Sequence, residues 1–318
     1  MKAPLIQIKN LKKYFSYNGQ TLRAVDDVSF DIFPQETVGL VGESGCGKTT
    51  LARALMRLYE PTSGNILFNG ENILTYHGKA IKSLRHEMQY IFQDPYSSLN
   101  PRMIAGEIIA EPLNIHNILN KSDREKRVQE LIELVGLRPE YIGRFPHECS
   151  GGQRQRIGIA RALALNPRFI VCDEPIAALD VSIQAQIVNL LKHLQEEMGL
   201  TYLFISHDLA MVKYLSMRVV VMYLGHLMEL APNDALYENP LHPYTQGLLS
   251  AIPIPDPHIT KKWTPILLTG EVPSPINPPK GCVFCTRCSK AQKICFEKRP
   301  ELKTISPGHQ VACHLVNP

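Results

Sequence analysis

A glycine-rich segment ending in a lysine and two threonines is the first part of this sequence that could do chemistry. Residues 42–50 read Gly-Glu-Ser-Gly-Cys-Gly-Lys-Thr-Thr and fit the pattern of a phosphate-binding loop. Glycines let backbone amides converge on phosphate oxygens. Lys48 would place a cation on the β- and γ-phosphates, and the Thr49 hydroxyl would face Mg²⁺. The residues that we expect to bind a nucleoside triphosphate are Gly42, Ser44, Gly45, Cys46, Gly47, Lys48, Thr49 and Thr50.

A second candidate site is a pair of acids at the end of an apolar run. Residues 169–175 read Phe-Ile-Val-Cys-Asp-Glu-Pro, so a buried strand would deliver Asp173 to its carboxyl end. There Asp173 can hold Mg²⁺, and Glu174 can act as the general base that polarises the attacking water. The alternative is a strand that merely ends in a charged turn, which the phosphate loop upstream disfavours.

A third motif is the segment Ser-Gly-Gly-Gln-Arg-Gln-Arg at 150–156, which opens a predicted helix. Ser150 can cap that helix, whose N-terminal amides would then face an anion. The motif resembles the signature sequence of ABC ATPases. In that family the anion is the γ-phosphate of ATP held by the opposite subunit. The resemblance implies that Ser150, Gly151, Gly152 and Gln153 bind ATP across a dimer of two cassettes.

Other positions match the remaining motifs of this family in order. Gln93 matches the Q-loop glutamine, which contacts Mg²⁺ or water and senses a transmembrane partner. Asp180 matches the D-loop, and His207 matches the switch histidine at the γ-phosphate. Phe15, or its neighbour Tyr14, occupies the adenine-stacking position.

Three positions depart from the family pattern. Cys149 stands where the signature usually has an apolar residue, a change that we expect to be mild. Ile176 and Ala177 stand where Thr and Ser are frequent, which removes hydroxyls near the dimer interface. Glu174 is intact, so we expect a hydrolysing site and not a regulatory cassette without turnover.

Short apolar runs that alternate with helical patterns predict an α/β fold with a largely parallel sheet. The runs lie at 38–41, 90–92, 169–172, 203–205 and 219–222, and the main helical patterns lie at 122–135 and 181–198. A helical pattern also follows the phosphate loop through Tyr59. The family resemblance implies a P-loop NTPase with a RecA-like core, an antiparallel β-subdomain and a helical subdomain near 94–165. We place this nucleotide-binding domain at 1–250.

Residues 251–318 are expected to form a proline-rich linker and a cysteine-rich extension. The prolines of the linker are Pro253, Pro255, Pro257, Pro273, Pro275, Pro278 and Pro279. The segments Asn-Pro-Leu-His-Pro-Tyr-Thr at 239–245 and Gly-Glu-Val-Pro-Ser-Pro at 270–275 resemble the ATPase subunits of bacterial dipeptide, oligopeptide and nickel importers. The segment at 94–102 also resembles this subfamily, which is our ground for the cargo class.

Five of the eight cysteines lie between Cys282 and Cys313. Cys282, Cys288, Cys295 and Cys313 are separated by five, six and seventeen residues, with Cys285 inside the first interval. Four thiolates can bind Zn²⁺ or an iron–sulfur cluster, although no standard spacing fits. The subfamily resemblance implies a [4Fe–4S] cluster on these four residues. Zinc and unmetallated thiols remain alternatives.

Composition narrows the class of protein. The formal net charge is +4 without a dense basic block, so we expect no nucleic-acid partner. No secretory signal and no apolar stretch long enough to span a bilayer are found. The resemblance implies a peripheral subunit on the cytoplasmic face of the inner membrane. Its partners would be two permeases, a second ATPase subunit, most often a paralogue, and an extracytoplasmic binding protein. A soluble ABC protein acting on ribosomes or DNA is the disfavoured alternative.

Overall fold

The chain forms two compact units in the computed structural model, which describes residues 3–252 and 266–316. Unit 1 contains residues 33–36 and 75–206. Unit 2 contains residues 4–32 and 37–74 and the described residues from 207 onward. The predicted linker prolines Pro253, Pro255 and Pro257 lie outside the described residues.

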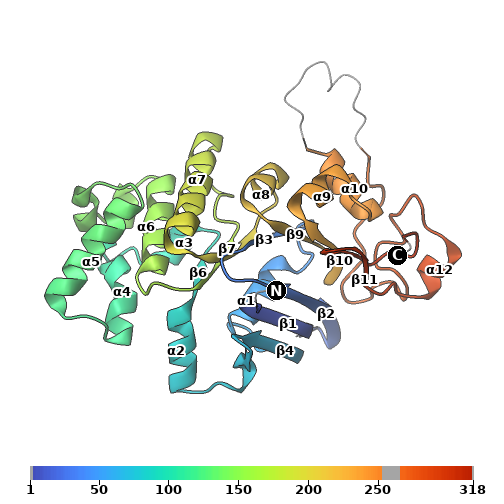
Figure 1. The fold of residues 1–318 in the computed structure, drawn as a ribbon, viewed down its shortest axis with the longest axis horizontal. Coiled ribbons are helices and arrows are strands. Elements are labelled where there is room, and N and C mark those ends of the chain that lie inside the picture. The colour runs from blue at the N-terminus through green and yellow to red at the C-terminus, as the bar shows by residue number, and fades with distance from the viewer. Residues whose placement is uncertain (1–2, 253–265, 317–318) are drawn as a thin grey trace, which may run out of the picture. The chain divides into compact units, whose positions relative to one another are not determined.

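Unit 1 consists of a small parallel sheet and a group of helices (Figure 1). Its elements are α2 (Lys79–Glu87), β6 (Met88–Ile91), α3 (Pro95–Ser98), α4 (Ala105–His116), α5 (Lys121–Leu134), η2 (Pro139–Gly143), η3 (Pro146–Glu148), α6 (Gly151–Leu163), β7 (Phe169–Asp173), α7 (Val181–Met198) and β8 (Thr201–Ile205). Helices α4 and α5 both pack against α6.

The strands of unit 1 explain where its acids lie. β7 pairs in parallel with β6 and with β8, and every residue of β7 and β8 is buried. Strands buried on both faces read as continuous apolar runs, as this sequence does. Parallel strands end at one edge of their sheet, so Asp173 lies opposite Ile205 at the carboxyl ends of β7 and β8.

Unit 2 contains two sheets and the cysteine-rich extension. Its elements are β1 (Ile6–Tyr17), β2 (Gln20–Ile32), β3 (Thr37–Val41), α1 (Lys48–Leu55), β4 (Ser63–Phe68), β5 (Glu71–Asn72), α8 (Leu209–Leu215), β9 (Arg218–Tyr223), β10 (His226–Pro232), α9 (Asn233–Glu238), α10 (Pro243–Ser250), α12 (Lys293–Glu297), β11 (Lys303–Ser306) and β12 (His309–Val311). The short η1 (Ile73–Thr75) lies at the point where the chain passes from unit 2 to unit 1.

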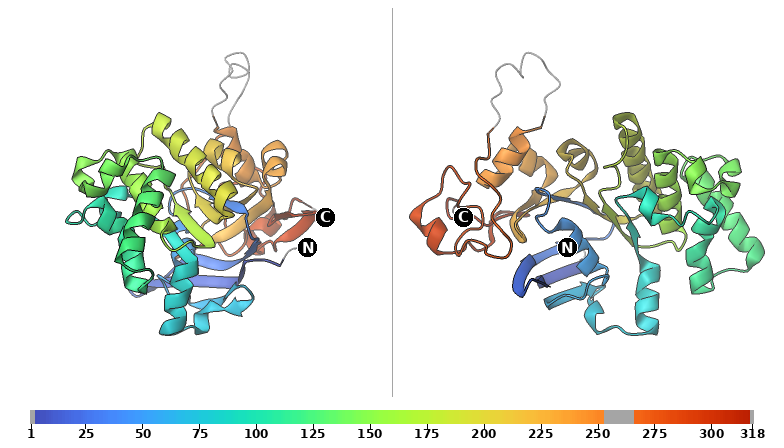
Figure 2. Two further views of the ribbon diagram at one scale, coloured as in Figure 1. Left: turned by 60° about the vertical axis from the view of Figure 1, so that its left-hand side comes forward. Right: turned by 180° about the vertical axis from the view of Figure 1, so that it is seen from behind.

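One sheet of unit 2 is antiparallel, with the strand order β2-β1-β4-β5, and its strands are drawn in blue shades in Figures 1 and 2. The other is mixed: β3 is fully buried and pairs in parallel with β9, whereas β9, β10, β12 and β11 are antiparallel neighbours. The predicted parallel pairing is thus confirmed for β3 with β9, as it is for β7 with β6 and β8 in unit 1, and β10, β12 and β11 add antiparallel strands that the sequence did not predict.

The extension is part of this second sheet, because β12 adds to the edge of β10. A buried hydrogen bond strengthens the join: Nε2 of His309 in β12 lies 2.7 Å from the carboxylate of Glu229, a fully buried residue of β10. The same carboxylate accepts the backbone N–H groups of Leu241 and His242. Glu229 therefore ties the 239–245 segment and the extension to one strand.

The helix after the phosphate loop is shorter than predicted. α1 ends at Leu55, and Arg57 adopts a left-handed backbone conformation with φ 51°, which a helix cannot contain. The predicted helix at 181–198 is confirmed as α7, and α5 lies within one residue of its predicted range. No helix of the described residues is long and apolar enough to cross a membrane.

Candidate active site

The phosphate loop connects β3 to α1 in unit 2, as the sequence predicts. Lys48 folds back over the loop, and its Nζ donates to the carbonyl oxygens of Gly42 at 2.7 Å and Glu43 at 3.1 Å. Ser44 and Gly45 at the tip are exposed. Cys46 is buried, and burial raises the pKa of its thiol although Lys48 opposes this. The loop thus holds a buried cation beneath an exposed tip, which suits a polyanion.

Gly47 shows why the loop needs glycine. Its φ of 106° lies in the left-handed region, and an added Cβ would meet the carbonyl oxygen of Ala24 at 2.1 Å. Gly47 also precedes α1, whose first turn carries no acidic residue to compete for an anion. Thr49 and Thr50 follow in that turn, with side chains partly exposed.

The two candidates for the adenine-stacking position lie in different surroundings. Phe15 packs edge-on against Tyr59, just after α1, at 5.5 Å between ring centroids, and Lys13 Nζ lies 4.7 Å from its ring. Tyr14 instead donates its hydroxyl to Asp26 at 2.5 Å, and burial together with this acid raises its pKa to about 12. Phe15 therefore stays the candidate for stacking, since Tyr14 is committed to Asp26.

The paired acids of unit 1 are held by neighbours on two other segments. Tyr90 in β6 donates its hydroxyl to Asp173 Oδ2 at 2.6 Å, and Asp173 is 2% exposed. Gln93 Nε2 donates to Glu174 Oε2 at 2.9 Å. Glu174 has a φ of 45°, which is rare and strained for a residue with a side chain. This bend turns its carboxylate out of the strand, where it is partly exposed.

The predicted signature helix is α6, and Ser150 caps it as expected. Ser150 Oγ accepts the N–H of Gln153 at 3.4 Å, and Gln153 Oε1 accepts the N–H of Ser150 at 2.8 Å. This reciprocal capping box leaves other first-turn amides at the helix terminus. The far end of the Gln153 side chain donates to the Tyr141 hydroxyl at 2.7 Å. Gly151 and Gly152 follow, and a Cβ on Gly152 would lie 2.5 Å from Ile183.

The last two predicted residues lie at the starts of helices. Asp180 is exposed at the N-cap of α7, where its side chain makes no capping bond. His207 is exposed and precedes Asp208, whose carboxylate caps α8 through the N–H groups of Ala210 and Met211. Of the candidates from the sequence, unit 1 brings Gln93 and Glu174 into direct contact.

Comparison with known proteins agrees with these motifs. The family described as "ABC transporter" matches residues 25–177, and "Oligopeptide/dipeptide transporter, C-terminal region" matches residues 228–295. The putative oligopeptide transport ATP-binding protein YkfD of Bacillus subtilis is 58% identical over 99% of this chain and 96% of its own length. The oligopeptide transport ATP-binding protein OppF of Haemophilus influenzae is 54% identical over 96% and 93%.

The chain belongs to the family of oligopeptide transport ATP-binding proteins.

Solved structures place this ABC ATPase among P-loop cassettes and confirm the predicted fold class. The cassette MJ0796 bound to ADP and Pi, in a dimeric post-hydrolysis state, matches with a TM-score of 0.66 at 28% identity. That match covers 72% of this chain and 98% of the other. CbiO1 from Clostridium perfringens matches with a TM-score of 0.67 at 26% identity, over 75% and 92%.

The cysteine-rich part of this oligopeptide transport ATP-binding protein brings several thiols close together. Burial raises the pKa of Cys282 to about 12, and the neighbouring thiols of Cys285, Cys295 and Cys313 add to the shift. Yet among the described residues no group of three or more His, Cys, Asp or Glu side chains is arranged to hold a metal ion. The structure therefore gives no support to the predicted iron–sulfur cluster or to zinc.

Sequence reasoning missed residues that support the site from a distance. Tyr90 holds Asp173, Tyr244 accepts the N–H of Glu43, and Arg287 donates to the Glu43 carboxylate. Tyr244 belongs to the 239–245 segment, which the sequence marked only as a subfamily likeness. No local signal predicts these contacts, because the partners are 83 to 244 positions apart.

Proposed function

We propose that this chain energises the import of oligopeptides by hydrolysing ATP, with its phosphate loop binding the nucleotide and its paired acids serving the chemistry. The observation that carries the proposal is the identity of 58% and 54% with oligopeptide transport ATP-binding proteins along nearly the whole chain. The match of residues 228–295 to the C-terminal region of oligopeptide/dipeptide transporters supports the cargo class.

In this proposal each side chain has the role that the family resemblance implies. Lys48 binds the β- and γ-phosphates, and the loop amides from Gly42 to Thr50 surround their oxygens. Phe15 stacks on adenine. Glu174 accepts a proton from the attacking water, and Gln93, which is bonded to it, orients the carboxylate and senses the partner. His207 contacts the γ-phosphate.

The donor set fits magnesium. Mg²⁺ prefers oxygen ligands and is usually bound by one or two carboxylates together with substrate phosphates, where it neutralises developing charge. Asp173 offers a carboxylate oxygen that Tyr90 already orients, while Thr49 and Gln93 offer a hydroxyl and an amide oxygen. We assign these residues to the metal.

A second cassette completes each nucleotide site in this proposal. The start of α6 binds the γ-phosphate of ATP on the partner cassette. The residues that take part are Ser150, Gly151, Gly152 and Gln153. Asp180 lies in the same interface. We infer that the partner is a paralogue. Because Ile176 is buried and Ala177 has no hydroxyl, the contact around Asp180 rests on the backbone and on this carboxylate.

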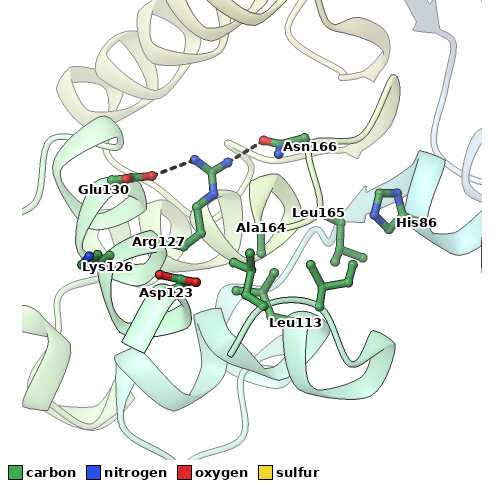
Figure 3. A pocket seen from close by; sticks show the side chains of 11 residues that line it. His86, Leu113, Asp123, Lys126, Arg127, Glu130, Ala164, Leu165 and Asn166 are labelled. Carbon is green, nitrogen blue, oxygen red and sulfur yellow. Dashed lines mark hydrogen bonds and ion pairs between the residues drawn. The ribbon is translucent and has the colours of Figure 1, made fainter. Parts of the chain in front are cut away.

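A groove in unit 1 is our candidate for the surface that meets a permease (Figure 3). It has a volume of about 440 Å³, and its apolar lining includes Leu113, Ile118 and Leu165. Charged residues of both signs rim it, and Arg127 is fixed by Glu130 at 3.2 Å and by Asn166 at 2.5 Å. An apolar floor with a fixed charged rim suits a short amphipathic helix.

Leu119 is our reason for choosing this groove. It lines the groove, is 45% exposed and has a φ of 68°, a conformation that is strained for leucine. We propose that a cytoplasmic segment of a permease subunit covers Leu119. The chain would then sit peripherally on the cytoplasmic face of the membrane, with two permeases, its paralogue and an extracytoplasmic binding protein in the complete system.

A pull-down of the tagged chain from native membranes in mild detergent tests this proposal. We expect mass spectrometry to recover two permeases and a second cassette. We expect Leu119→Glu to lose the permeases while ATP binding is retained. Met217→Glu, a change at a 55% exposed residue outside the groove, serves as the matched control and should retain them. Recovery of ribosomal or DNA-repair proteins without a membrane subunit would contradict the proposal.

For the cysteine-rich extension, the finer proposal is a [4Fe–4S] cluster on Cys282, Cys288, Cys295 and Cys313, with Cys285 left over. It rests on the four thiols and on subfamily resemblance alone. Iron and sulfide analysis of the chain purified without oxygen is the test, with zinc measured in the same sample. We expect four irons for each chain. If the analysis finds zinc or no metal, the cluster proposal is wrong, and the ATPase assignment is unchanged.

A further inference from the structure

The cysteine-rich extension reaches the phosphate loop through one arginine. Arg287 Nη1 lies 3.0 Å and 2.8 Å from the two carboxylate oxygens of Glu43, the second residue of the loop. The side chain of Arg287 is 7% exposed and that of Glu43 is 24% exposed, so the pair is largely shielded from water. Shielded ion pairs interact more strongly than surface pairs.

The backbone of Glu43 is held from the same side. Its N–H donates to the hydroxyl of Tyr244 at 2.9 Å, and Tyr244 is completely buried. Phe284 of the extension packs against both Tyr244 and Tyr223, with ring centroids 5.3 Å from each, and the two tyrosine rings lie 4.7 Å apart. The Tyr223 hydroxyl lies 3.3 Å from Arg287. The backbone and the side chain of Glu43 are therefore both fixed by one packed cluster.

This cluster is connected directly to the cysteines. Phe284 and Arg287 alternate with Cys282, Cys285 and Cys288 along the chain, and Cys282 is anchored by its N–H to the carbonyl oxygen of Cys295 at 2.8 Å. A change in the cysteine-rich segment would therefore displace Phe284 and Arg287.

The charges of Arg287 and Glu43 suggest a function for their contact. A triphosphate bound at the loop carries several negative charges, and the Glu43 carboxylate would repel it. Arg287 neutralises that carboxylate and fixes the loop backbone beside Lys48, which donates to the Glu43 carbonyl oxygen.

We propose that the extension is a built-in positioning element for ATP binding, in which Arg287 neutralises and holds Glu43. This inference rests on the nucleotide lying at the phosphate loop, as proposed above. Arg287 is a positioning residue, because it acts through Glu43 and not on the substrate.

The test is a double-mutant cycle on the full-length chain. Calorimetry measures the ATP dissociation constant of each variant, and KM and kcat are measured with the assembled transporter. We expect Arg287→Met to raise the dissociation constant and KM on the order of tenfold, with kcat close to that of the parent. Arg287→Lys keeps the charge and should retain most of the affinity. In Glu43→Gln/Arg287→Met the repelling carboxylate is gone, so the affinity should return toward that of the parent.

Arg299→Met is the matched control. Like Arg287, Arg299 belongs to the extension and pairs with an acidic side chain of unit 2: its Nη1 lies 3.5 Å from Asp26 Oδ2. Asp26 lies outside the phosphate loop. If Arg299→Met weakens ATP binding as much as Arg287→Met, the extension acts only through stability and the proposal is wrong. It is equally wrong if folded Arg287→Met binds ATP like the parent, or if the double variant shows no recovery. Lys48→Ala in the same series tests the premise separately: if it binds ATP like the parent, the nucleotide does not lie at the phosphate loop.

Discussion

Glu174→Gln should lower ATP turnover by about 10²–10⁴-fold, the range that general bases contribute, while ATP binding persists. The reason is geometric. Glu174 follows the buried Asp173 and bends out of β7 with a φ of 45°, and it is partly exposed, so its carboxylate can meet water. Glutamine has the same shape but cannot accept the proton.

The Gln93 contact sharpens this expectation. Gln93 Nε2 donates to Glu174 Oε2 at 2.9 Å, and the amide oxygen of a glutamine at 174 can accept the same bond, so the local structure should be retained. Phosphate release and nucleotide binding measured on the same preparation separate the two effects. Glu196→Gln, at an exposed acid of α7 in the same unit, is the matched control and should leave both unchanged. Unaltered phosphate release in Glu174→Gln would exclude Glu174 as the base.

Lys48→Met should weaken ATP binding by about 10²–10⁴-fold, because removing one member of a buried charged pair costs about 3–5 kcal/mol. Lys48 is 6% exposed, and its ammonium group bonds to the carbonyl oxygens of Gly42 and Glu43. Methionine fills the space of the stem but supplies neither the cation for the phosphates nor the donors for these carbonyls.

Equilibrium binding of a fluorescent ATP analogue measures this effect, and thermal unfolding shows whether the variant is folded. Lys303→Met, which removes an exposed lysine of β11, should bind like the parent. If folded Lys48→Met binds the analogue as tightly as the control, the phosphate loop is not the nucleotide site. The Arg287 proposal would then lose its premise.

The iron–sulfur cluster stays a prediction that rests on the subfamily likeness and on the thiols alone. Cys282, Cys285 and Cys288 share a short segment, and the structure gathers them near Cys295 and Cys313. However, ligation requires a defined geometry and not only proximity. No ligand group is formed within the described residues.

Local chemistry could be predicted from the sequence alone. The phosphate loop, the Asp173-Glu174 pair and the cap of α6 by Ser150 each act through residues within a few positions of one another. Their geometry is therefore set by short stretches of backbone, by glycines that accept a left-handed conformation and by hydrogen bonds three residues apart. Buried parallel strands appeared as apolar runs because both of their faces are covered.

Only the tertiary structure decided which distant side chains support these motifs. The choice between Tyr14 and Phe15 could not be made from alternation, because β1 has register shifts at Lys13 and Tyr14 that break the period of two. Tyr90 reaches Asp173 because β6 pairs with β7, and Arg287 reaches Glu43 across 244 positions because the extension packs on β10 and α10. Such contacts depend on how elements pack, and a pattern along one segment contains no information about its partner.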